Sequence, residues 1–233
     1  MRTGEPTEVG TMIDAVVLDA FGTIVRINRR MSPYQELIRE GRRQGCDLKS
    51  VGTQFLMTTN LSLVEAASQL GISLSPAKRA ELSRALELEL SSVEPFPDAL
   101  EAISRLQGAG LKLGICSNLA SPYGPVLKEL FPAMDGYAFS YEVGAIKPDP
   151  VIYQAICSQM EVEPGHHFGS KRGGVMMIGD SKKCDQYGPR LIGVMGLHLD
   201  RNGQGAINDL QQFAELVIDQ NRQFRSGRCG EHK

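Results

Sequence analysis

Residues 15–25 read Ala-Val-Val-Leu-Asp-Ala-Phe-Gly-Thr-Ile-Val, and this stretch decides the fold. Its first four residues are apolar, and the run ends abruptly at the carboxylate of Asp19. A short apolar run of this kind, bounded by a turn at Gly22, predicts a strand that is buried on both faces of a sheet. A carboxylate that follows such a strand lies at the carboxyl edge of a parallel sheet, where open α/β folds bind their ligands. The simpler alternative is that Asp19 only caps a turn.

The composition is that of an ordinary soluble globular protein, because 42% of the 233 residues are hydrophobic and 22% are charged. The net charge of −2 gives no electrostatic reason to expect nucleic acid or an anionic membrane as a partner. No apolar run approaches the roughly 18 residues that a transmembrane helix needs. The five cysteines form no Cys-x-x-Cys pair, which favours reduced thiols in a cytoplasmic protein. We expect a monomer or homodimer.

Residues 28–94 are predicted to form an insertion that contains only helices. The segment carries three helix-start signals, which are Ser32-Pro33, Ser62 with Glu65 three residues later, and Ser75-Pro76. They predict helices at about residues 33–44, 62–71 and 75–92. No strand pattern occurs between them, so we expect an all-helical domain.

From residue 95 onward the chain alternates between helix and strand. The expected strands cover residues 111–116, 137–140, 173–178 and 193–199, and the expected helices include residues 182–191 and 206–219. Strands separated by helices imply a parallel sheet. We therefore predict an α/β fold with a doubly wound, Rossmann-like parallel sheet built from residues 12–27 and 95–220. We expect a disordered leader at residues 1–11 and a flexible tail at residues 221–233.

Polar side chains follow four of the predicted strands. They are Asp19 with Thr23, Ser117-Asn118, Lys147, and Asp180 with Asp185. The carboxyl ends of parallel strands meet at one edge of a sheet, so these groups should lie close together. A carboxylate can act as a nucleophile, hydroxyl and amide groups can bind anionic oxygens, and a lysine can neutralise a phosphate. Two further carboxylates can hold Mg²⁺, which completes the set of groups that phosphoryl transfer needs.

Four segments resemble, in the same order, the four motifs of the haloacid dehalogenase superfamily. These segments are Asp19-Ala20-Phe21-Gly22-Thr23, Ser117-Asn118, Lys147-Pro148-Asp149-Pro150 and Gly179-Asp180-Ser181-x-x-x-Asp185. The resemblance covers about residues 12–216. It extends to the helical insertion at residues 28–94, which is similar to the helical cap domain that closes over the site in this family and selects the substrate.

The resemblance implies a hydrolase that acts on a small anionic metabolite through a covalent aspartyl intermediate. It makes Asp19 the nucleophile and Lys147 the lysine that neutralises charge. It makes Thr23, Ser117 and Asn118 the residues that bind the anionic group of the substrate.

The resemblance also implies a magnesium site. Asp19, the backbone carbonyl of Phe21 and Asp180 would be the ligands, and Asp185 would support them nearby. The Gly-Asp-Ser sequence at residues 179–181 is similar to the metal-binding form of the last motif. Dehalogenases of the family need no metal and tend to carry Ser and Asn in this motif.

Phe21 departs from the pattern of the family's phosphatases, which carry a second Asp at this position. That Asp protonates the leaving group and later activates water, and a phenyl ring can do neither. Haloacid dehalogenases accept an aromatic residue here because halide leaves without a proton, and phosphonate-cleaving members also lack the second Asp. Three functions therefore stay open: Mg²⁺-dependent hydrolysis of a phosphate or phosphonate, metal-independent hydrolysis of 2-haloacids, and binding without turnover. Asp180 and Lys147 favour the first.

A run of arginines lies in and before the first helix of the insertion. Such a run is typical of a solvated helix face. The alternative is that Arg39 or Arg42 reaches over the site and binds a carboxylate or phosphate of the substrate through two hydrogen bonds.

Overall fold

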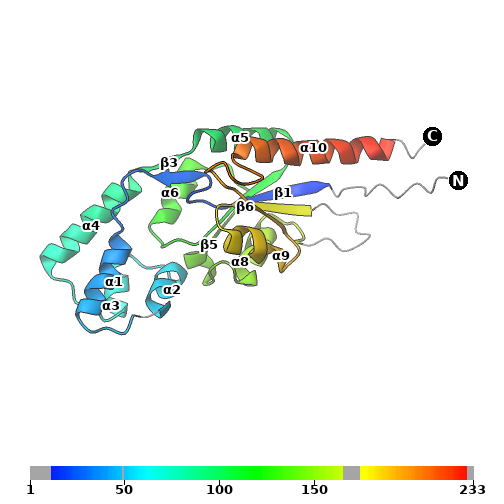
Figure 1. The fold of residues 1–233 in the computed structure, drawn as a ribbon. Coiled ribbons are helices and arrows are strands. Elements are labelled where there is room, and N and C mark those ends of the chain that lie inside the picture. The colour runs from blue at the N-terminus through cyan, green and yellow to red at the C-terminus, as the bar shows by residue number, and fades with distance from the viewer. Residues whose placement is uncertain (1–11, 49, 165–173, 230–233) are drawn as a thin grey trace.

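A computed structural model describes residues 12–48, 50–164 and 174–229 of the chain. A five-stranded parallel sheet lies at its centre, in the strand order β5-β4-β1-β6-β7 (Figure 1). The strands are β1 (Ile13–Leu18), β4 (Lys112–Ser117), β5 (Gly136–Phe139), β6 (Gly174–Gly179) and β7 (Met195–His198). The predicted α/β fold is thereby confirmed. The leader expected at residues 1–11 lies outside the described residues.

Helices cover both faces of the sheet. The helices α5 (Pro97–Gly108), α6 (Tyr123–Leu130) and α10 (Leu210–Cys229) pack on one face, and α8 (Pro150–Gln159) packs on the other. Strand β1 contributes to both interfaces, because Val16 and Leu18 join the first core and Ala15 and Val17 join the second. This alternation is the period of two that a pleated strand imposes. Burial on both faces explains why β1 is apolar up to Asp19.

Four further helices form a lobe apart from the sheet, which we call the cap (Figure 1). They are α1 (Pro33–Arg43), α2 (Ser50–Thr58), α3 (Leu63–Gln69) and α4 (Pro76–Leu90). The cap has its own core, which includes Leu37, Leu63 and Leu82. The side chains of Ser62 and Ser75 cap α3 and α4 as predicted. Helix α2 was not predicted from the sequence, since no capping signal precedes it.

A two-stranded antiparallel ribbon connects the cap to the sheet. It pairs β2 (Val25–Ile27) with β3 (Val93–Pro95). The segment that enters the cap and the segment that leaves it therefore run side by side. The prediction that residues 28–94 contain no strand is wrong at β3. This strand has only three residues, among them Glu94 and Pro95, so no apolar alternation reveals it. Its partner lies far away in the sequence, and only the tertiary fold brings the two together.

The last helix is longer than predicted. Helix α10 runs from Leu210 to Cys229, whereas the sequence predicted an end at Asp219 and a flexible tail from residue 221. The flexibility expected from residue 221 stays a prediction, but the expected end at Asp219 is wrong, because residues 220–229 continue the helix. The reason is Asn221, which is buried and whose amide accepts a hydrogen bond from Ile13 N at 2.7 Å and donates one to Ile13 O at 2.8 Å. The Asn221 side chain thus ties the middle of α10 to the start of β1.

The helix predicted at residues 182–191 is interrupted. The chain forms a π-helical segment, η1 (Lys182–Tyr187), followed by the short α9 (Gly188–Arg190), and a further short helix, α7 (Ser140–Val143), follows β5. Segments of π-helix are often found at functional sites. Among the described residues, no helix is long and apolar enough to cross a membrane.

Candidate active site

The carboxyl edge of the sheet brings together the polar side chains that the sequence pointed to. Asp19 follows β1, Ser117 ends β4, and Lys147 lies in the loop before α8. Asp180 and Asp185 follow β6, and the second of them lies on η1. The contacts below show that segments far apart in the sequence meet here.

The carboxylate of Asp19 is buried and fixed by three hydrogen bonds. Its Oδ1 accepts one from Ser117 Oγ at 3.2 Å and one from Lys147 Nζ at 2.6 Å. Its Oδ2 accepts one from Thr23 Oγ1 at 3.1 Å. A carboxylate oxygen offers about two acceptor positions, so Oδ1 is saturated while Oδ2 keeps one. Asp19 is therefore held in orientation and still has an oxygen lone pair for a metal or a substrate.

Lys147 is buried between two carboxylates. Its Nζ lies 2.6 Å from Asp19 Oδ1 and 2.7 Å from Asp185 Oδ1. Burial acts to lower the pKa of Lys147, but the two carboxylates outweigh this effect and raise the pKa well above its ordinary value. Burial also raises the pKa of Asp185 to about 6, against the opposing effect of the Lys147 ammonium. The second oxygen of Asp185 accepts a hydrogen bond from Ser181 N at 2.9 Å, so this residue anchors both Lys147 and the start of η1.

The three residues predicted to bind the substrate anion hold the site together in this structure. Asn118 accepts a hydrogen bond from Lys147 N at 2.7 Å through Oδ1 and donates one to Lys147 O at 3.0 Å through Nδ2. Thr23 and Ser117 donate to the Asp19 carboxylate, and Thr23 Oγ1 also accepts from Asp180 N at 3.2 Å. Anion binding by these three residues stays a prediction.

The carboxylates suit a hard divalent cation. One oxygen from each of Asp19, Asp180 and Asp185 lies within 4.8 Å of the others, and an all-oxygen set is the type that Mg²⁺ prefers. Asp185 is committed to Lys147, which leaves Asp180 as the natural second ligand. Burial and the negative charge of the neighbouring Asp19 raise the pKa of Asp180. A bound cation would offset the repulsion between these two carboxylates.

Gly22 allows Asp180 to approach the loop that carries Asp19. A Cβ atom at Gly22 would lie 2.3 Å from Asp180 Oδ2, and the φ of +82° is in the left-handed region that disfavours side chains. Any other residue at this position would displace the Asp180 carboxylate.

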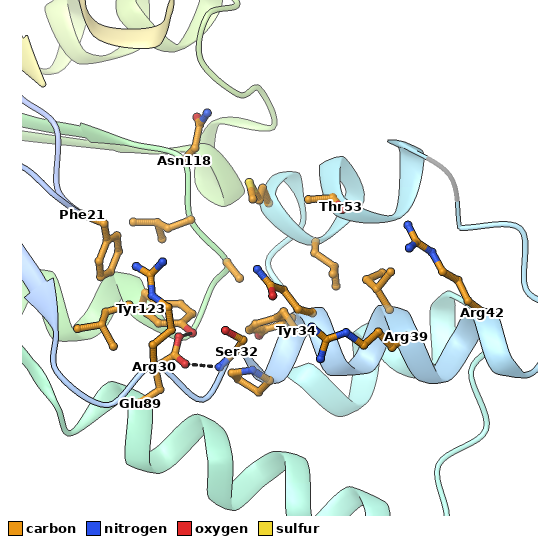
Figure 2. A pocket seen from close by; sticks show the side chains of 18 residues that line it. Phe21, Arg30, Ser32, Tyr34, Arg39, Arg42, Thr53, Glu89, Asn118 and Tyr123 are labelled. Atoms are coloured by element: carbon orange, nitrogen blue, oxygen red, sulfur yellow. Dashed lines mark hydrogen bonds between the residues drawn. The ribbon is translucent and has the colours of Figure 1, made fainter. Parts of the chain in front are cut away.

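A pocket of about 470 Å³ lies between the site and the cap. Phe21 lines it at one end, and its ring packs edge-on against Tyr123 with centroids 5.6 Å apart (Figure 2). Arg39 and Arg42, which the sequence predicted to bind substrate, also line this pocket. Arg39 pairs with Glu36 at 3.0 Å, and Arg42 lies at the end remote from Phe21 (Figure 2). Their role in binding stays a prediction.

Arg201 is a residue that sequence reasoning missed. It lies between β7 and α10 and donates hydrogen bonds to Gly22 O at 3.3 Å and Thr23 O at 2.6 Å. It also pairs with Asp98 at 3.0 Å, and its guanidinium lies 3.9 Å from the centroid of the Phe96 ring. It therefore positions the loop after β1. No local motif marks it, because its partners belong to other elements.

An aspartate at the edge of an α/β sheet, paired with a buried lysine and beneath a helical cap, defines a class of hydrolases. The chain matches the haloacid dehalogenase-like hydrolase family over residues 13–185, and it belongs to this family. This confirms the resemblance seen in the motifs. No curated protein matches the chain.

Solved structures share the fold at low sequence identity. A HAD phosphatase from Thermococcus onnurineus is 22% identical, with a TM-score of 0.58 over 88% of this chain and 98% of that one. An L-2-haloacid dehalogenase is 18% identical, with a TM-score of 0.57 over 89% and 99%. The HAD hydrolase YfnB from Bacillus subtilis, solved with magnesium bound, is 16% identical, with a TM-score of 0.57 over 88% and 99%. Phosphatases and dehalogenases thus share this architecture.

Replacing the buried lysine should destabilise the protein in a pH-dependent way. Lys147→Met removes the ammonium from two buried carboxylates, and we expect a loss of about 3 kcal/mol at pH 8. Without the ammonium, the pKa of Asp185 rises above its present value of about 6. The folded state then binds a proton that the unfolded chain, with an ordinary carboxyl pKa of about 4, has released, so the loss should shrink at pH 5.

Urea unfolding at pH 5 and pH 8 in the presence of a chelator measures this effect. Lys183→Met, at an exposed position on η1, is the matched control and should change stability little at either pH. An equal loss at both pH values for Lys147→Met would contradict the ion-pair account.

Arg201→Ala should loosen the loop after β1. We expect a loss of about 2 kcal/mol, because the carbonyls of Gly22 and Thr23 and the carboxylate of Asp98 lose a charged donor. Arg222→Ala removes an exposed arginine that pairs with Asp219 on α10, and it should change stability by less than about 1 kcal/mol. Thermal unfolding of both variants compares them directly, and equal melting temperatures would rule out the positioning role.

Proposed function

We propose that this hydrolase acts on a small phosphorylated metabolite in a Mg²⁺-dependent reaction through a covalent intermediate at Asp19. The observation that carries the proposal is the arrangement of Asp19, Lys147 and Asp180 beneath the cap. Lys147 contacts the Asp19 carboxylate at 2.6 Å, and the carboxylate of Asp180 lies against the same loop. The Lys147 ammonium, together with the cation that Asp180 would help to hold, would suit a phosphate better than an uncharged carbon centre.

The chemistry follows from the groups present. An Asp19 carboxylate oxygen attacks phosphorus and forms an acyl phosphate, and the bond from phosphorus to the leaving oxygen breaks with its electron pair on that oxygen. Water then attacks the phosphorus of the acyl phosphate, and the bond from phosphorus to the Asp19 oxygen breaks with its electron pair on that oxygen. This restores the Asp19 carboxylate and releases phosphate, and the proton lost by the water passes to the phosphate or to solvent. Lys147 keeps positive charge next to both anions throughout. Asp19, Asp180 and the backbone carbonyl of Phe21 would hold Mg²⁺, which supplies further positive charge for the phosphate oxygens.

Phe21 limits the choice of leaving group. Among the described residues that line the pocket, Glu89 is the one carboxyl group, and its oxygens accept hydrogen bonds from Met31 N, Ser32 N and the Tyr123 hydroxyl. Burial and the bond to Glu89 raise the pKa of Tyr123, so this hydroxyl is a poor acid. The pocket therefore favours a leaving group that is stable as an anion, such as a phenolate, an enolate or a carboxylate.

Phe21 also favours a second candidate, the metal-independent hydrolysis of a 2-haloacid. Halide leaves without a proton, so the missing acid is no disadvantage. The Asp19 oxygen would then attack carbon and release halide. The carboxylate of Asp180 weighs against this candidate. Unless a cation is bound, its negative charge would repel an anionic haloacid that approaches Asp19.

Phosphate release from a panel of aryl and acyl phosphates, with Mg²⁺ and with a chelator, tests the proposal. We expect release that needs Mg²⁺ and that falls to background in Asp19→Asn. Chloride release from 2-chloropropionate in the presence of the chelator would support the dehalogenase instead. Silence of the folded protein on both panels would support binding without turnover.

Supplying an acid at position 21 should broaden the range of leaving groups. In Phe21→Asp, hydrolysis of alkyl phosphates should rise by about 10²-fold, because an alkoxide needs a proton to leave. The first step with 4-nitrophenyl phosphate, measured as the initial release of 4-nitrophenolate, should change by only a few-fold, since its leaving group is already stable. Phe21→Leu controls for the loss of the ring that packs on Tyr123. Equal gains on both esters would contradict the account of Phe21.

A further inference from the structure

One wall of the pocket carries Arg30, an exposed arginine that has no counter-ion among the described residues. Arg30 lies between β2 and α1, and Figure 2 shows its side chain beside Tyr123, reaching towards Phe21. Within residues 12–48, 50–164 and 174–229 it forms no ion pair or hydrogen bond. A guanidinium in a pocket is a fork of donors whose geometry matches a carboxylate.

Glu89, the one acidic residue among the described residues that line the pocket, already accepts three hydrogen bonds. Glu89 is buried at the end of α4, and its Oε2 accepts hydrogen bonds from Met31 N and Ser32 N, both at 2.6 Å. Its Oε1 accepts from the Tyr123 hydroxyl at 2.7 Å. Glu89 therefore connects the start of α1 to the core helix α6, and three hydrogen bonds hold its carboxylate without Arg30.

A second group in the pocket lacks a partner. The hydroxyl of Tyr34 is fully buried and has no hydrogen-bond partner within the described part of the chain. Buried polar atoms are nearly always hydrogen-bonded, so an orphan hydroxyl in a pocket wall indicates a ligand that completes it. Tyr34 lines the same pocket as Arg30, and its ring lies 6.4 Å from that of Tyr123.

The remaining walls describe the body of the ligand. They mix polar side chains with a set of apolar and aromatic ones, which includes Phe21, Ile27, Ile38, Leu56, Met57 and Tyr123. The apolar and aromatic side chains fit a planar or branched hydrocarbon skeleton. One unpaired guanidinium beside Glu89 can balance a single negative charge, which suits a carboxylate rather than a second phosphate dianion.

We propose that Arg30 and Tyr34 bind a carboxylate of the substrate, which is an apolar, ring-sized phosphate ester with one carboxylate away from the reacting phosphate. The assignment rests on the proposed function, because it requires that the organic part of the phosphate ester binds in this pocket. It differs from the expectation for Arg39, which pairs with Glu36, and for Arg42, which lies at the far end of the pocket.

Calorimetric titration with non-hydrolysable probes tests the proposal. The probes are phenylphosphonate and its 3-carboxy and 4-carboxy derivatives, each titrated in the presence of Mg²⁺. The wild-type protein should bind at least one carboxylated probe about 10-fold more tightly than phenylphosphonate. Arg30→Ala should abolish this preference and leave the affinity for phenylphosphonate unchanged. Arg30→Lys should retain only part of it, because an ammonium lacks the fork.

Two further variants sharpen the result. Arg29→Ala removes the adjacent arginine, which is exposed like Arg30 but does not line the pocket, so the preference should survive. Tyr34→Phe removes only the orphan hydroxyl and should weaken binding of the carboxylated probe alone. The proposal is overturned if the wild-type protein shows no preference, if Arg30→Ala keeps it, or if Arg30→Ala lowers only the melting temperature, as a residue that merely balances Glu89 would.

Turnover of the matching esters separates this proposal from the proposed function. Phenyl phosphate and its two carboxylated derivatives are offered to the same set of proteins. Phosphate release without an Arg30-dependent preference would overturn the assignment of Arg30 and leave the hydrolase intact. Binding of the carboxylated phosphonates through Arg30 without phosphate release from any ester would support the assignment of Arg30 and overturn the proposed hydrolysis of phosphate esters.

Discussion

A buried ammonium between two carboxylates holds the active edge of the sheet together. Lys147 contacts Asp19 after β1 and Asp185 on η1, so one side chain connects three segments that are remote in the sequence. None of the three charges could be buried alone, because removing one partner leaves an uncompensated charge in a medium of low polarisability. The loops at this edge must therefore adopt the positions that bring the three groups together, and the catalytic geometry is a consequence of this requirement.

The loop after β1 is fixed from a second direction. Gly22 leaves room for the Asp180 carboxylate, and Arg201 binds the carbonyls of Gly22 and Thr23 from the far side. The loop is thus held by a close approach on one side and by charged hydrogen bonds on the other. Such double support is what a nucleophile needs in order to keep its orientation while charge develops on the substrate.

The pocket and the loop impose different requirements on the substrate. The charges around Asp19 select a group that can be attacked next to a cation, whereas Phe21 selects a leaving group that needs no proton. The cap adds apolar walls, and the segment between β2 and α1 adds Arg30, which forms no ion pair with another described residue. The ribbon of β2 and β3 sets where these walls lie relative to the core. Reaction type and substrate preference therefore depend on different parts of the chain.

The sequence by itself determined the sheet, its strand-end chemistry and the presence of a helical insertion, because burial patterns and capping residues are local. It pointed to Asp19, Lys147 and Asp180 for the same reason, since each directly follows or flanks an element that the pattern predicts. Only the tertiary structure decided the pairing of β2 with β3, the extension of α10 held by Asn221, and the contacts of Arg201. It also decided that Asn118 binds the backbone of Lys147 and that Arg30 lines the pocket with no ion-pair partner in the part of the chain that the structure describes. These features depend on contacts between residues far apart in the chain, and no local pattern encodes which distant group a side chain will meet.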